Sequence, residues 1–566
     1  FSAVPPTANV QATDYALVLD ETVPGVIGTG TVFKTTVANL TGAATALAEA
    51  AQATANSARG PVVSILDWNG VDPTGNNLND TQFQAWLAEL LTNPLACVAW
   101  LPAGRYALSQ TLIGTLPANL GITIYGDGRD MTELYWVADV DGIHLSLPSN
   151  AGNFERQPTG VYQGASIVLR DISLVRDLPT SAAGRTAFHI DNPTLSIGSG
   201  IRQVLLDHVK MRGTISGSSV GGWLTGAWYD CVAQTDTYDL TVHSVGTGCT
   251  ALQINGNGAT GTFSVSHRIV NINTHGASGL VVGDYVQGIT WVGGDVINGD
   301  YGAYANAPLK GVDGLQISSV QFSAKLCGVW ANWISDLCLS NNYFLITNAS
   351  TSGVQIYNPI SFAITGNTFG GFDAAGQYGV YVDAGQIASA NAPMPKTIVG
   401  NAFSHFNHTG SYAVYFVGYR ETATLSGTVT SGDTLSLTIT SAAVAGSPVT
   451  VSVTAGSSDT LITLATALAA AVNANTALTA VGIAATSAGA VVTIAEPRTL
   501  FAPFQTAPVW ASSVSGSATE VITLAALLPV ENATVGPNQV GYVTTFGYDN
   551  AAPGMNQWFM NGTVNT

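Results

Sequence analysis

The chain has 566 residues and a formal net charge of −18, and 9% of its residues are charged. Roughly 25% is usual in soluble proteins, so Gly, Ser, Thr and Asn occupy many positions where Lys and Glu are normally found. The acidic excess argues against a nucleic-acid ligand, because phosphate backbones are bound by clustered Lys and Arg. The apolar segments fall short of the roughly 18 residues that a transmembrane helix needs, so we expect no membrane insertion.

The five cysteines do not form a pattern typical of a disulfide scaffold or a metal site. Their odd number leaves at least one thiol free, and the sequence contains no CxxC pair. It also lacks the Gly-rich phosphate loop, the HExxH helix and the Ser nucleophile elbow. We therefore predict neither a metal nor another cofactor. We expect the cysteines to be small buried side chains: Cys97, Cys231, Cys249, Cys327 and Cys338.

Residues 1–60 are predicted to form an extended arm and then a helical neck. Residues 1–36 are rich in Pro, Thr and Val, whereas residues 37–58 favour a helix but contain few large apolar side chains. Such a helix cannot bury itself, and identical helices around a symmetry axis would supply its neighbours. Because the chain starts at Phe1 rather than Met, we also expect that an N-terminal part has been removed.

Residues 61–165 are predicted to form an N-terminal cap and the first turns of a repetitive fold. From Val62 the sequence predicts a strand, a polar loop and a helix capped near Asn79 or Asp80. Two further strands contain the sequences LPAGRY and ITIYGDG. The helix has one apolar face, formed by Phe83, Trp86, Leu87 and Leu90.

This order of elements resembles the opening of pectate-lyase-type right-handed parallel β-helices, as found in phage tailspikes. The resemblance rests on the loop Asp72-Pro-Thr-Gly, the helix start Asn79-Asp80-Thr81, LPAG-x-Y and I-x-GDG, over about 75 residues. The sequence departs from the family pattern because the acidic pair of the DG-x-T-D-D-T motif is reduced. The resemblance implies a homotrimer that acts on a polysaccharide.

A short repeat sets the architecture predicted for residues 166–420. An apolar residue, two or three small or polar residues and a second apolar residue recur, with central spacings of 22 to 26 residues. This period is the rung length of a three-stranded parallel β-solenoid. Asn342, Asn367 and Asn401 fall at one offset of the repeat, which predicts an asparagine ladder in a turn.

A second strand in each rung places alternate side chains outside. The alternation predicts an exposed column, formed by His189, Trp228, Gln253, Val281, Tyr304, Trp330, Gln355, Tyr381 and Tyr415. Two residues further on runs a polar column that includes Asp191, Asp230, Asn255, Asn306, Asn332 and Asp383. Aromatic rings in a line indicate a binding surface, either a glycan groove or a contact with another subunit.

Catalysis on the solenoid would depend on Asp, because no Glu lies between Glu155 and Glu421. Asp230 and Asp284 are two rungs apart, or about 10 Å, which is near the separation of inverting glycosidases. Two further candidates are Asp300, in the turn predicted to lead into Tyr304, and Asp295, at the start of the preceding predicted strand. Asp236 and Asp239, three residues apart in a predicted turn, form another possible pair.

The predicted substrate contacts on the exposed column are Trp228, Gln253, Tyr304, Trp330 and Tyr381. His267 and Arg268, on the strand that follows residues 251–255, are predicted to join them. A lyase would need a base and a cation for a uronate; His243 or His267 could be the base. Basic residues are few on the solenoid, which favours a hydrolase: the choices are Lys210, Arg212, Arg268, Lys310 and Lys325.

Residues 421–535 change character to Thr- and Val-rich strands with one helix near residues 459–472. This nearly uncharged module, similar to modules of phage tail proteins, suits adhesion or trimer packing better than catalysis. Residues 536–566 are again β-like and are predicted to return to the end of the solenoid.

The sequence thus predicts an all-β protein dominated by a right-handed three-stranded parallel β-helix, with a helical neck and a C-terminal mostly-β module. The resemblance implies a homotrimeric tailspike in the phage virion, joined to the tail baseplate, that acts outside the host cell. It would hydrolyse an O-antigen or capsular polysaccharide. Two alternatives stay open: a polysaccharide lyase that acts by β-elimination, and a non-catalytic adhesin or tail fibre.

Overall fold

A computed structural model describes much of residues 62–558. The described ranges are 62–92, 98–117, 120–147, 166–176, 185–192, 203–213, 221–244, 248–258, 263–308, 311–346, 352–371, 374–383, 394–417, 420–496, 508–517, 519–527, 533–543, 547–549 and 557–558, with the single residues 178, 246 and 261. The arm and helical neck predicted for residues 1–60 lie outside them, as does Cys97.

The N-terminal cap follows the elements predicted from the sequence. It contains β1 (Val62–Ser64), a 3-10 turn (Ile65–Asp67), β2 (Thr74–Leu78) and helix α2 (Asp80–Thr92). The apolar face of α2 is buried, with Phe83, Trp86, Leu87 and Leu90 inside. Periodicity therefore predicted this helix correctly.

The motif residues Asp72 and Asp80 hold the cap together. Asp72 accepts hydrogen bonds from the amides of Thr74 and Asn77, both at 2.8 Å, and the bond from the Thr74 hydroxyl is the largest cause that lowers its pKa to about 2. Asp80 accepts from the amide of Ser109 at 2.7 Å and from its hydroxyl at 2.6 Å. The Asx turn at Asp72 and the link from the start of α2 to the end of β4 (Gly104–Leu108) account for this part of the motif.

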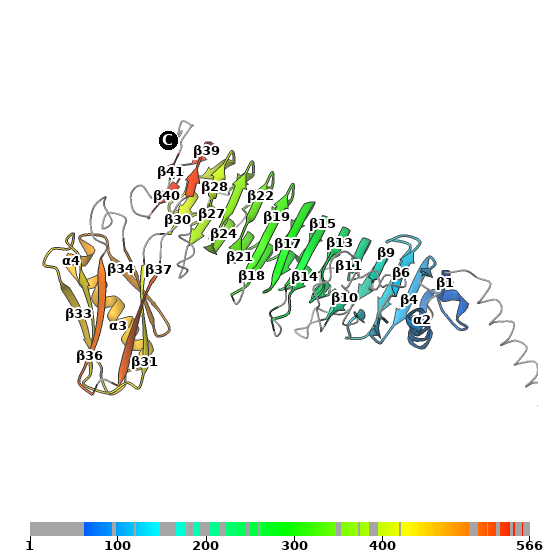
Figure 1. Cartoon of the computed structure of the whole chain (residues 1–566), viewed down its shortest axis with the longest axis horizontal. Helices are drawn as coiled ribbons and strands as arrows, with labels where there is room; N and C mark the ends of the chain where they lie inside the picture. Colours follow the sequence, from blue (N-terminus) through cyan, green and yellow to red (C-terminus); the bar gives the residue numbers. More distant parts are fainter. Residues whose placement is uncertain are drawn as a thin grey trace, which may run out of the picture. The chain divides into compact units, whose positions relative to one another are not determined.

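Most strands belong to one large parallel sheet that is wound as a parallel β-helix (Figure 1). Each strand pairs with the strand one rung earlier and one rung later, so the rungs form ladders. Ladder A contains β5 (Leu112–Thr115), β8 (Ile143–Ser146), β10 (Thr186–Asp191), β12 (Thr225–Asp230), β14 (Thr250–Asn255), β16 (Ser278–Val282), β18 (Tyr301–Asn306), β21 (Cys327–Ser335), β24 (Ser352–Pro359), β27 (Tyr378–Asp383), β30 (Tyr412–Phe416) and β40 (Gly547–Asp549).

Ladder B and ladder C follow ladder A in each rung. Ladder B contains β3 (Val98–Leu101), β6 (Gly121–Gly126), β9 (Ser166–Arg176), β11 (Val204–Arg212), β13 (Thr235–His243), β15 (Ser264–His275), β17 (Val286–Ile297), β19 (Val312–Ser318), β22 (Leu337–Ser340), β25 (Phe362–Thr365), β28 (Lys396–Val399), β38 (Ala533–Val535) and β41 (Gln557–Trp558). Ladder C contains β2, β4 (Gly104–Leu108), β7 (Thr132–Trp136), β20 (Gln321–Ser323), β23 (Tyr343–Leu345), β26 (Thr368–Gly370), β29 (Ala402–Phe406) and β39 (Gln539–Val543).

The long strands from β9 to β17 belong to both ladder B and ladder C. Strand β17 pairs with β19 through its first half and with β20 through its second half. At least one residue in the middle of each long strand has a positive φ, which turns the chain from one ladder to the next. These corner residues are Asp171 (φ 56), His208 (φ 53), Asp239 (φ 48), Asn271 (φ 65) and Gly293 (φ 76). Most are Asp, Asn or Gly, which tolerate this conformation best.

The interior contains stacked apolar side chains and one polar ladder. Phe344, Phe369 and Phe403 stack with ring centroids 4.7 Å apart. The predicted asparagine ladder is confirmed: the Nδ2 of Asn342 donates to Oδ1 of Asn367, and Asn367 donates likewise to Asn401, both at 3.0 Å. A fourth member of the ladder, Asn538, was not predicted.

The chain leaves the solenoid after β30 and forms a separate module. Its strands are β31 (Arg420–Gly427), β32 (Thr434–Thr440), β33 (Val449–Thr454), β34 (Ala484–Ala488), β35 (Val491–Ala495), β36 (Val509–Ser515) and β37 (Glu520–Leu527), in two antiparallel sheets. Helix α3 (Leu461–Ala474) buries Leu464, Leu468 and Val472, and the short α4 (Thr476–Thr479) follows it. Strand β38 already pairs with β28, so the chain rejoins the solenoid before residue 536.

Two sequence-based expectations concern cysteines and membranes. Cys231, Cys249, Cys327 and Cys338 are free thiols, and the first three are buried. Within the described ranges, no helix is long and apolar enough to cross a bilayer.

Candidate functional site

The exposed column on ladder A has the register that the sequence predicted. Strand pairing aligns His189 with Trp228 and then Gln253, Val281, Tyr304, Trp330, Gln355, Tyr381 and Tyr415. It also adds His144 of β8 on the rung before His189. We call this row, from His144 to Tyr415, the outward column. Its members are partly exposed, whereas their sequence neighbours are buried in the core.

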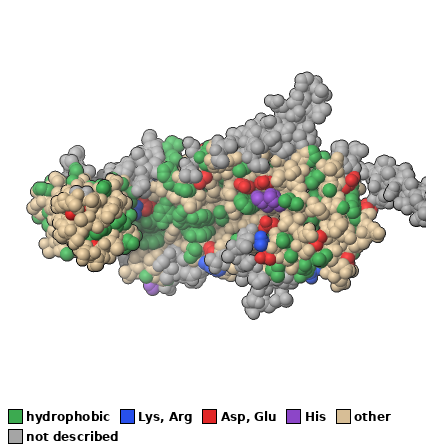
Figure 2. Space-filling model, turned by 90° about the horizontal axis from the view of Figure 1, so that it is seen from below, with side chains coloured by type: hydrophobic (Ala, Val, Ile, Leu, Met, Phe, Trp, Pro, Cys, Tyr) green, Lys and Arg blue, Asp and Glu red, His purple; other side chains and the backbone are tan. Residues whose placement is uncertain are grey.

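The C-terminal half of the outward column is aromatic. Tyr304 and Trp330 stack with centroids 4.6 Å apart, and Tyr381 and Tyr415 are nearly parallel at 5.6 Å. Tyr357, on the neighbouring polar row, bridges the two pairs: its centroid is 5.4 Å from Trp330 and 5.8 Å from Tyr381. Figure 2 shows hydrophobic side chains gathered along one face of the solenoid, beside a cluster of His and acidic side chains.

The N-terminal half of the outward column is a stack of two imidazoles and an indole. The centroids of His144 and His189 are 4.3 Å apart, and those of His189 and Trp228 are also 4.3 Å apart, at an interplanar angle of 8°. Asn255, in the amide orientation that satisfies both of its groups, accepts from Trp228 Nε1 at 3.1 Å. These contacts fix the three rings on consecutive rungs.

Two carboxylates lie beside this ring stack. Asp191 ends β10 and Asp230 ends β12, and the two residues are register partners. Neighbouring rungs are about 4.8 Å apart. Asp191 Oδ1 lies 3.4 Å from His144 Nε2, and Asp230 Oδ1 accepts from Cys231 Sγ at 3.5 Å. We call His144, His189, Trp228, Asp191 and Asp230 the acid cluster.

The two carboxyl groups of the acid cluster have opposite pKa shifts. Burial raises the pKa of Asp230; the bond from Cys231 lowers it in part, and the charge of Asp191 raises it further. Burial also opposes ionisation of Asp191, but contacts with His144 and Ser146 outweigh it and lower that pKa. Asp191 in turn raises the pKa of His144, whereas burial lowers that of His189 to about 4. Carboxyls whose environments separate their pKa values are suited to acid and base roles.

The acid cluster also has unused hydrogen-bonding capacity. Within the described part of the chain, the buried His189 Nε2 has no hydrogen-bond partner, and the buried His144 Nε2 and Asp191 Oδ1, which face each other at 3.4 Å, make no hydrogen bond of good geometry. Buried polar atoms are normally paired, so their concentration at one point indicates a place where a polar ligand completes the bonding.

The other predicted catalytic residues lie apart from the acid cluster. Asp284 follows β16, one position beyond the polar row and two rungs from Asp230, and its carbonyl accepts from Gly256 at 2.9 Å. Asp295 lies inside β17 rather than at the start of a strand, and it aligns with Asn273 and Gln321 on ladder C. Asp300 lies at the opposite end of the ladder A strands, where its carboxylate accepts from the amide of Gly248 at 2.9 Å. Asp295 and Asp300 are therefore not brought together with Asp230.

His267 does not face outward, which corrects its predicted role in substrate binding. Its side chain is 2% exposed. Its Nδ1 pairs with Thr235 Oγ1 at 2.9 Å and its Nε2 with Ser264 Oγ at 3.1 Å. Burial lowers its pKa to about 4. His267 lies two residues before the buried Ile269, so the alternation of β15 places its side chain inside the solenoid.

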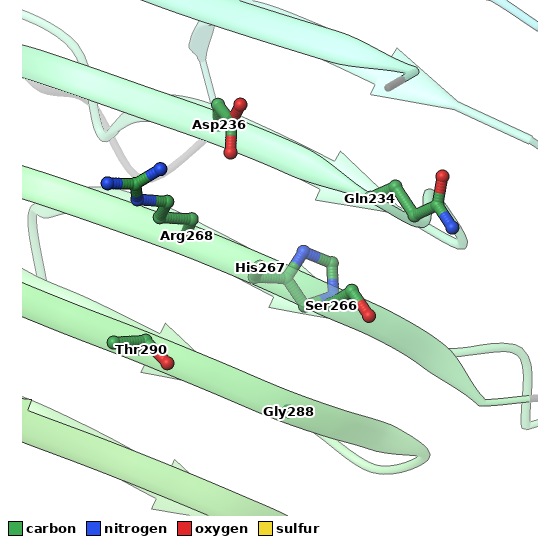
Figure 3. A pocket seen from close by; sticks show the side chains of 7 residues that line it. All are labelled: Gln234, Asp236, Ser266, His267, Arg268, Gly288 and Thr290. Atoms are coloured by element: carbon green, nitrogen blue, oxygen red, sulfur yellow. The ribbon is translucent and has the colours of Figure 1, made fainter. Parts of the chain in front are cut away.

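Arg268, the next residue, lies exposed in a shallow groove on ladder B with a volume of about 590 Å³ (Figure 3). Its guanidinium carbon is 5.7 Å from the ring centroid of Tyr238. Asp236 also lines this groove. Asp239 is a corner residue whose carboxylate lies 3.1 Å from His208 Nε2; both aspartates lie within β13, not in a turn as predicted.

Sequence reasoning missed two members of the acid cluster. His144 precedes the first rung that the repeat revealed, so its alignment with His189 had no signal. Asp191 was in the predicted polar column, and its position one rung before Asp230 was the available signal for a pair.

No family model and no curated protein matches this chain. Similar solved structures include the catalytic domain of a GH87 α-1,3-glucanase in complex with tetrasaccharides, with 11% identity, a TM-score of 0.32 and coverage of 61% of each chain. The surface adhesin PfbA of Streptococcus pneumoniae has 10% identity and a TM-score of 0.31, covering 63% of this chain and 92% of that one. The tailspike protein gp49 of Acinetobacter baumannii bacteriophage Fri1, a capsular polysaccharide depolymerase, has 12% identity, a TM-score of 0.23 and coverage of 82% and 88%. This chain thus spans about three fifths of the length of the glucanase domain.

Proposed function

We propose that this chain binds a bacterial surface polysaccharide along the outward column and cleaves it by glycoside hydrolysis at the acid cluster. The observation that carries the proposal is that the outward column leads into the acid cluster. The row of side chains runs from Tyr415 to Trp228, where it meets two carboxylates, Asp191 and Asp230. Aromatic faces stack on sugar rings, while Asp, Asn and Gln side chains hydrogen-bond to hydroxyl groups. A row of aromatic and amide side chains that repeats about every 4.8 Å therefore suits an extended polymer.

Hydrolysis is favoured over elimination by the residue types at the site. Glycoside hydrolysis requires one protonated and one ionised carboxyl group. The pKa of Asp230 is raised, which favours its protonated form, and the pKa of Asp191 is lowered, which favours its ionised form. A lyase needs a cation to hold a uronate, whereas neither the outward column nor the acid cluster contains Lys or Arg. Of the four aspartates predicted to be catalytic, Asp230 is the one that we retain as a catalytic group.

We further propose the finer organisation that the opening motif implies. The rungs would wind right-handedly with three strands each, and three chains would associate as a phage tailspike that acts at the host surface. The helix predicted for residues 37–58 supports association, because it needs apolar neighbours. Light scattering coupled to size-exclusion chromatography should give the mass of three chains; the mass of one chain would contradict the trimer.

The experiment that tests the activity is incubation with purified O-antigens and capsular polysaccharides, followed by mass spectrometry. Products of one or more repeating units plus 18 mass units would establish hydrolysis. Products without this gain, absorbing as unsaturated uronates, would establish a lyase instead. Measurable binding without any product would make the chain an adhesin. The Asp230→Asn variant, which keeps the shape of the side chain, should bind the cleaved polysaccharide and release no product.

A further inference from the structure

We propose that Asp191 and Asp230 form a retaining catalytic pair, with Asp191 as the nucleophile, Asp230 as the general acid and base, and His144 as the positioning residue of Asp191. This inference rests on the proposed function and names the partner carboxylate that the sequence-based pairing of Asp230 with Asp284 did not identify.

The separation of the two residues carries the inference. Asp191 and Asp230 are direct register partners on adjacent strands of ladder A, so their side chains leave the sheet about 4.8 Å apart. Carboxyl groups of retaining glycosidases are about 5–5.5 Å apart, whereas inverting enzymes need about 6.5–9.5 Å for a water molecule between them. Asp284, two rungs from Asp230, lies at about 10 Å by the same spacing. Adjacent rungs therefore favour direct attack by one carboxylate.

The surroundings decide which carboxylate attacks. Asp191 faces His144 and Ser146 on β8, and both favour its ionised form. Burial raises the pKa of Asp230 and the negative charge of Asp191 raises it further, whereas the bond from the Cys231 thiol at 3.5 Å lowers it in part, so the neutral form of Asp230 is favoured. A carboxylate that is held ionised suits the nucleophile, and one held protonated suits the acid.

His144 is held in a fixed orientation. Its ring stacks on His189, which stacks on Trp228, and its Nε2 lies 3.4 Å from Asp191 Oδ1. The imidazole therefore reaches Asp191 from the rung below, while Asp230 approaches it from the rung above. His144 would not touch the reacting atoms; it would keep Asp191 ionised and aimed at the sugar.

The reaction balances with water as the second reactant. In the first step an Asp191 oxygen bonds to the anomeric carbon, the glycosidic C–O bond breaks, and the Asp230 proton passes to the leaving oxygen. In the second step Asp230 takes a proton from water, whose oxygen bonds to the anomeric carbon as the bond to Asp191 breaks. Two inversions at one carbon give net retention.

The test follows the anomeric configuration of the first product by proton NMR, using the polysaccharide of the panel that the wild-type protein cleaves. Retention is expected, and inversion would assign the chemistry to a wider pair such as Asp230 and Asp284. Asp191→Asn and Asp230→Asn should each lower kcat by at least about 10²–10⁴-fold, with binding of the polysaccharide unchanged. Asp295→Asn is the matched control, because it removes an aspartate of ladder C, and its kcat should stay within twofold of wild type.

The role of His144 has its own readout. In His144→Asn the acid limb of the kcat/KM profile should shift to higher pH, because Asp191 loses the contact that favours its ionised form. The groups left facing Asp191 are Ser146, His189, Asp230 and Cys231. His144→Gln, whose side-chain amide can donate to Asp191, should shift the acid limb less than His144→Asn does. An unshifted limb in both variants would reduce His144 to a packing role.

The outcomes separate the two proposals. If the wild-type protein cleaves no polysaccharide, the proposed function fails and the catalytic pair with it. If it cleaves but Asp191→Asn keeps full activity, or the product is inverted, the proposed function stands and the retaining pair is wrong.

Discussion

Asn401 and Asn538 are adjacent members of one asparagine ladder although 137 residues separate them in the sequence: Asn401 Nδ2 donates to Asn538 Oδ1 at 3.2 Å. The segment between them includes the whole antiparallel module from β31 to β37. The module is therefore an insertion into the solenoid: the chain leaves after β30 on ladder A and returns at β38 on ladder B, just before Asn538.

We expect the Asn538→Ala variant to lose stability at this end of the solenoid. The substitution removes the acceptor for both the amide and the side chain of Asn401, and a buried unpaired polar group costs about 1–3 kcal/mol. Denaturant unfolding monitored by circular dichroism should show this decrease. Asn76→Ala is the control, because Asn76 is exposed; an equal decrease in both variants would contradict the role assigned to the ladder.

The inserted module should become less stable as the pH rises from about 4.5 to 7. Burial raises the pKa of Glu496 to about 7, and the bond from Trp510 opposes this shift only in part. In this pH window the folded state holds a proton that the unfolded state releases, so stability falls with increasing pH and then becomes constant. The change is on the order of 3 kcal/mol. Glu496→Gln should flatten the profile of melting temperature against pH; an unchanged slope would assign it to another group.

Removing a ring from the outward column should weaken glycan binding and leave the chemical step intact. For Trp330→Ala or Tyr381→Ala we expect the KM for the cleaved polysaccharide to rise about tenfold, or ~1.4 kcal/mol, with kcat nearly unchanged, because these rings lie several rungs from the carboxylates. Tyr343→Ala is the matched control, since Tyr343 is a 40% exposed tyrosine on ladder C. Equal KM values for all variants would favour subunit packing as the role of the column.

His267→Ala should affect stability rather than catalysis. The substitution leaves the hydroxyl groups of Thr235 and Ser264 without their imidazole partner inside the solenoid, at a cost of about 1–3 kcal/mol. The variant should unfold at lower denaturant concentration, while folded protein keeps the wild-type kcat. A large fall in kcat at unchanged stability would restore His267 to the site.

The sequence by itself determined the parallel architecture and the register of the outward column. A repeat of 22 to 26 residues places equivalent positions above one another in a parallel solenoid, and the alternation of strands separates Trp228, Tyr304 and Trp330 from the core. The folded protein keeps the register and the alternation predicted from the repeat, because each rung contacts mainly its two neighbours.

The tertiary structure decided which polar groups meet. It brought His144, from a rung outside the recognised repeat, to Asp191, and it buried His267 where the sequence indicated a surface histidine. It separated Asp295 from Asp230 by bending β17 at Gly293 into a second ladder, and it returned Asn538 to Asn401 after an inserted module. These relationships depend on where corners bend and where loops rejoin, and neither follows from a repeat period, since a loop of any length can connect strands in the same register.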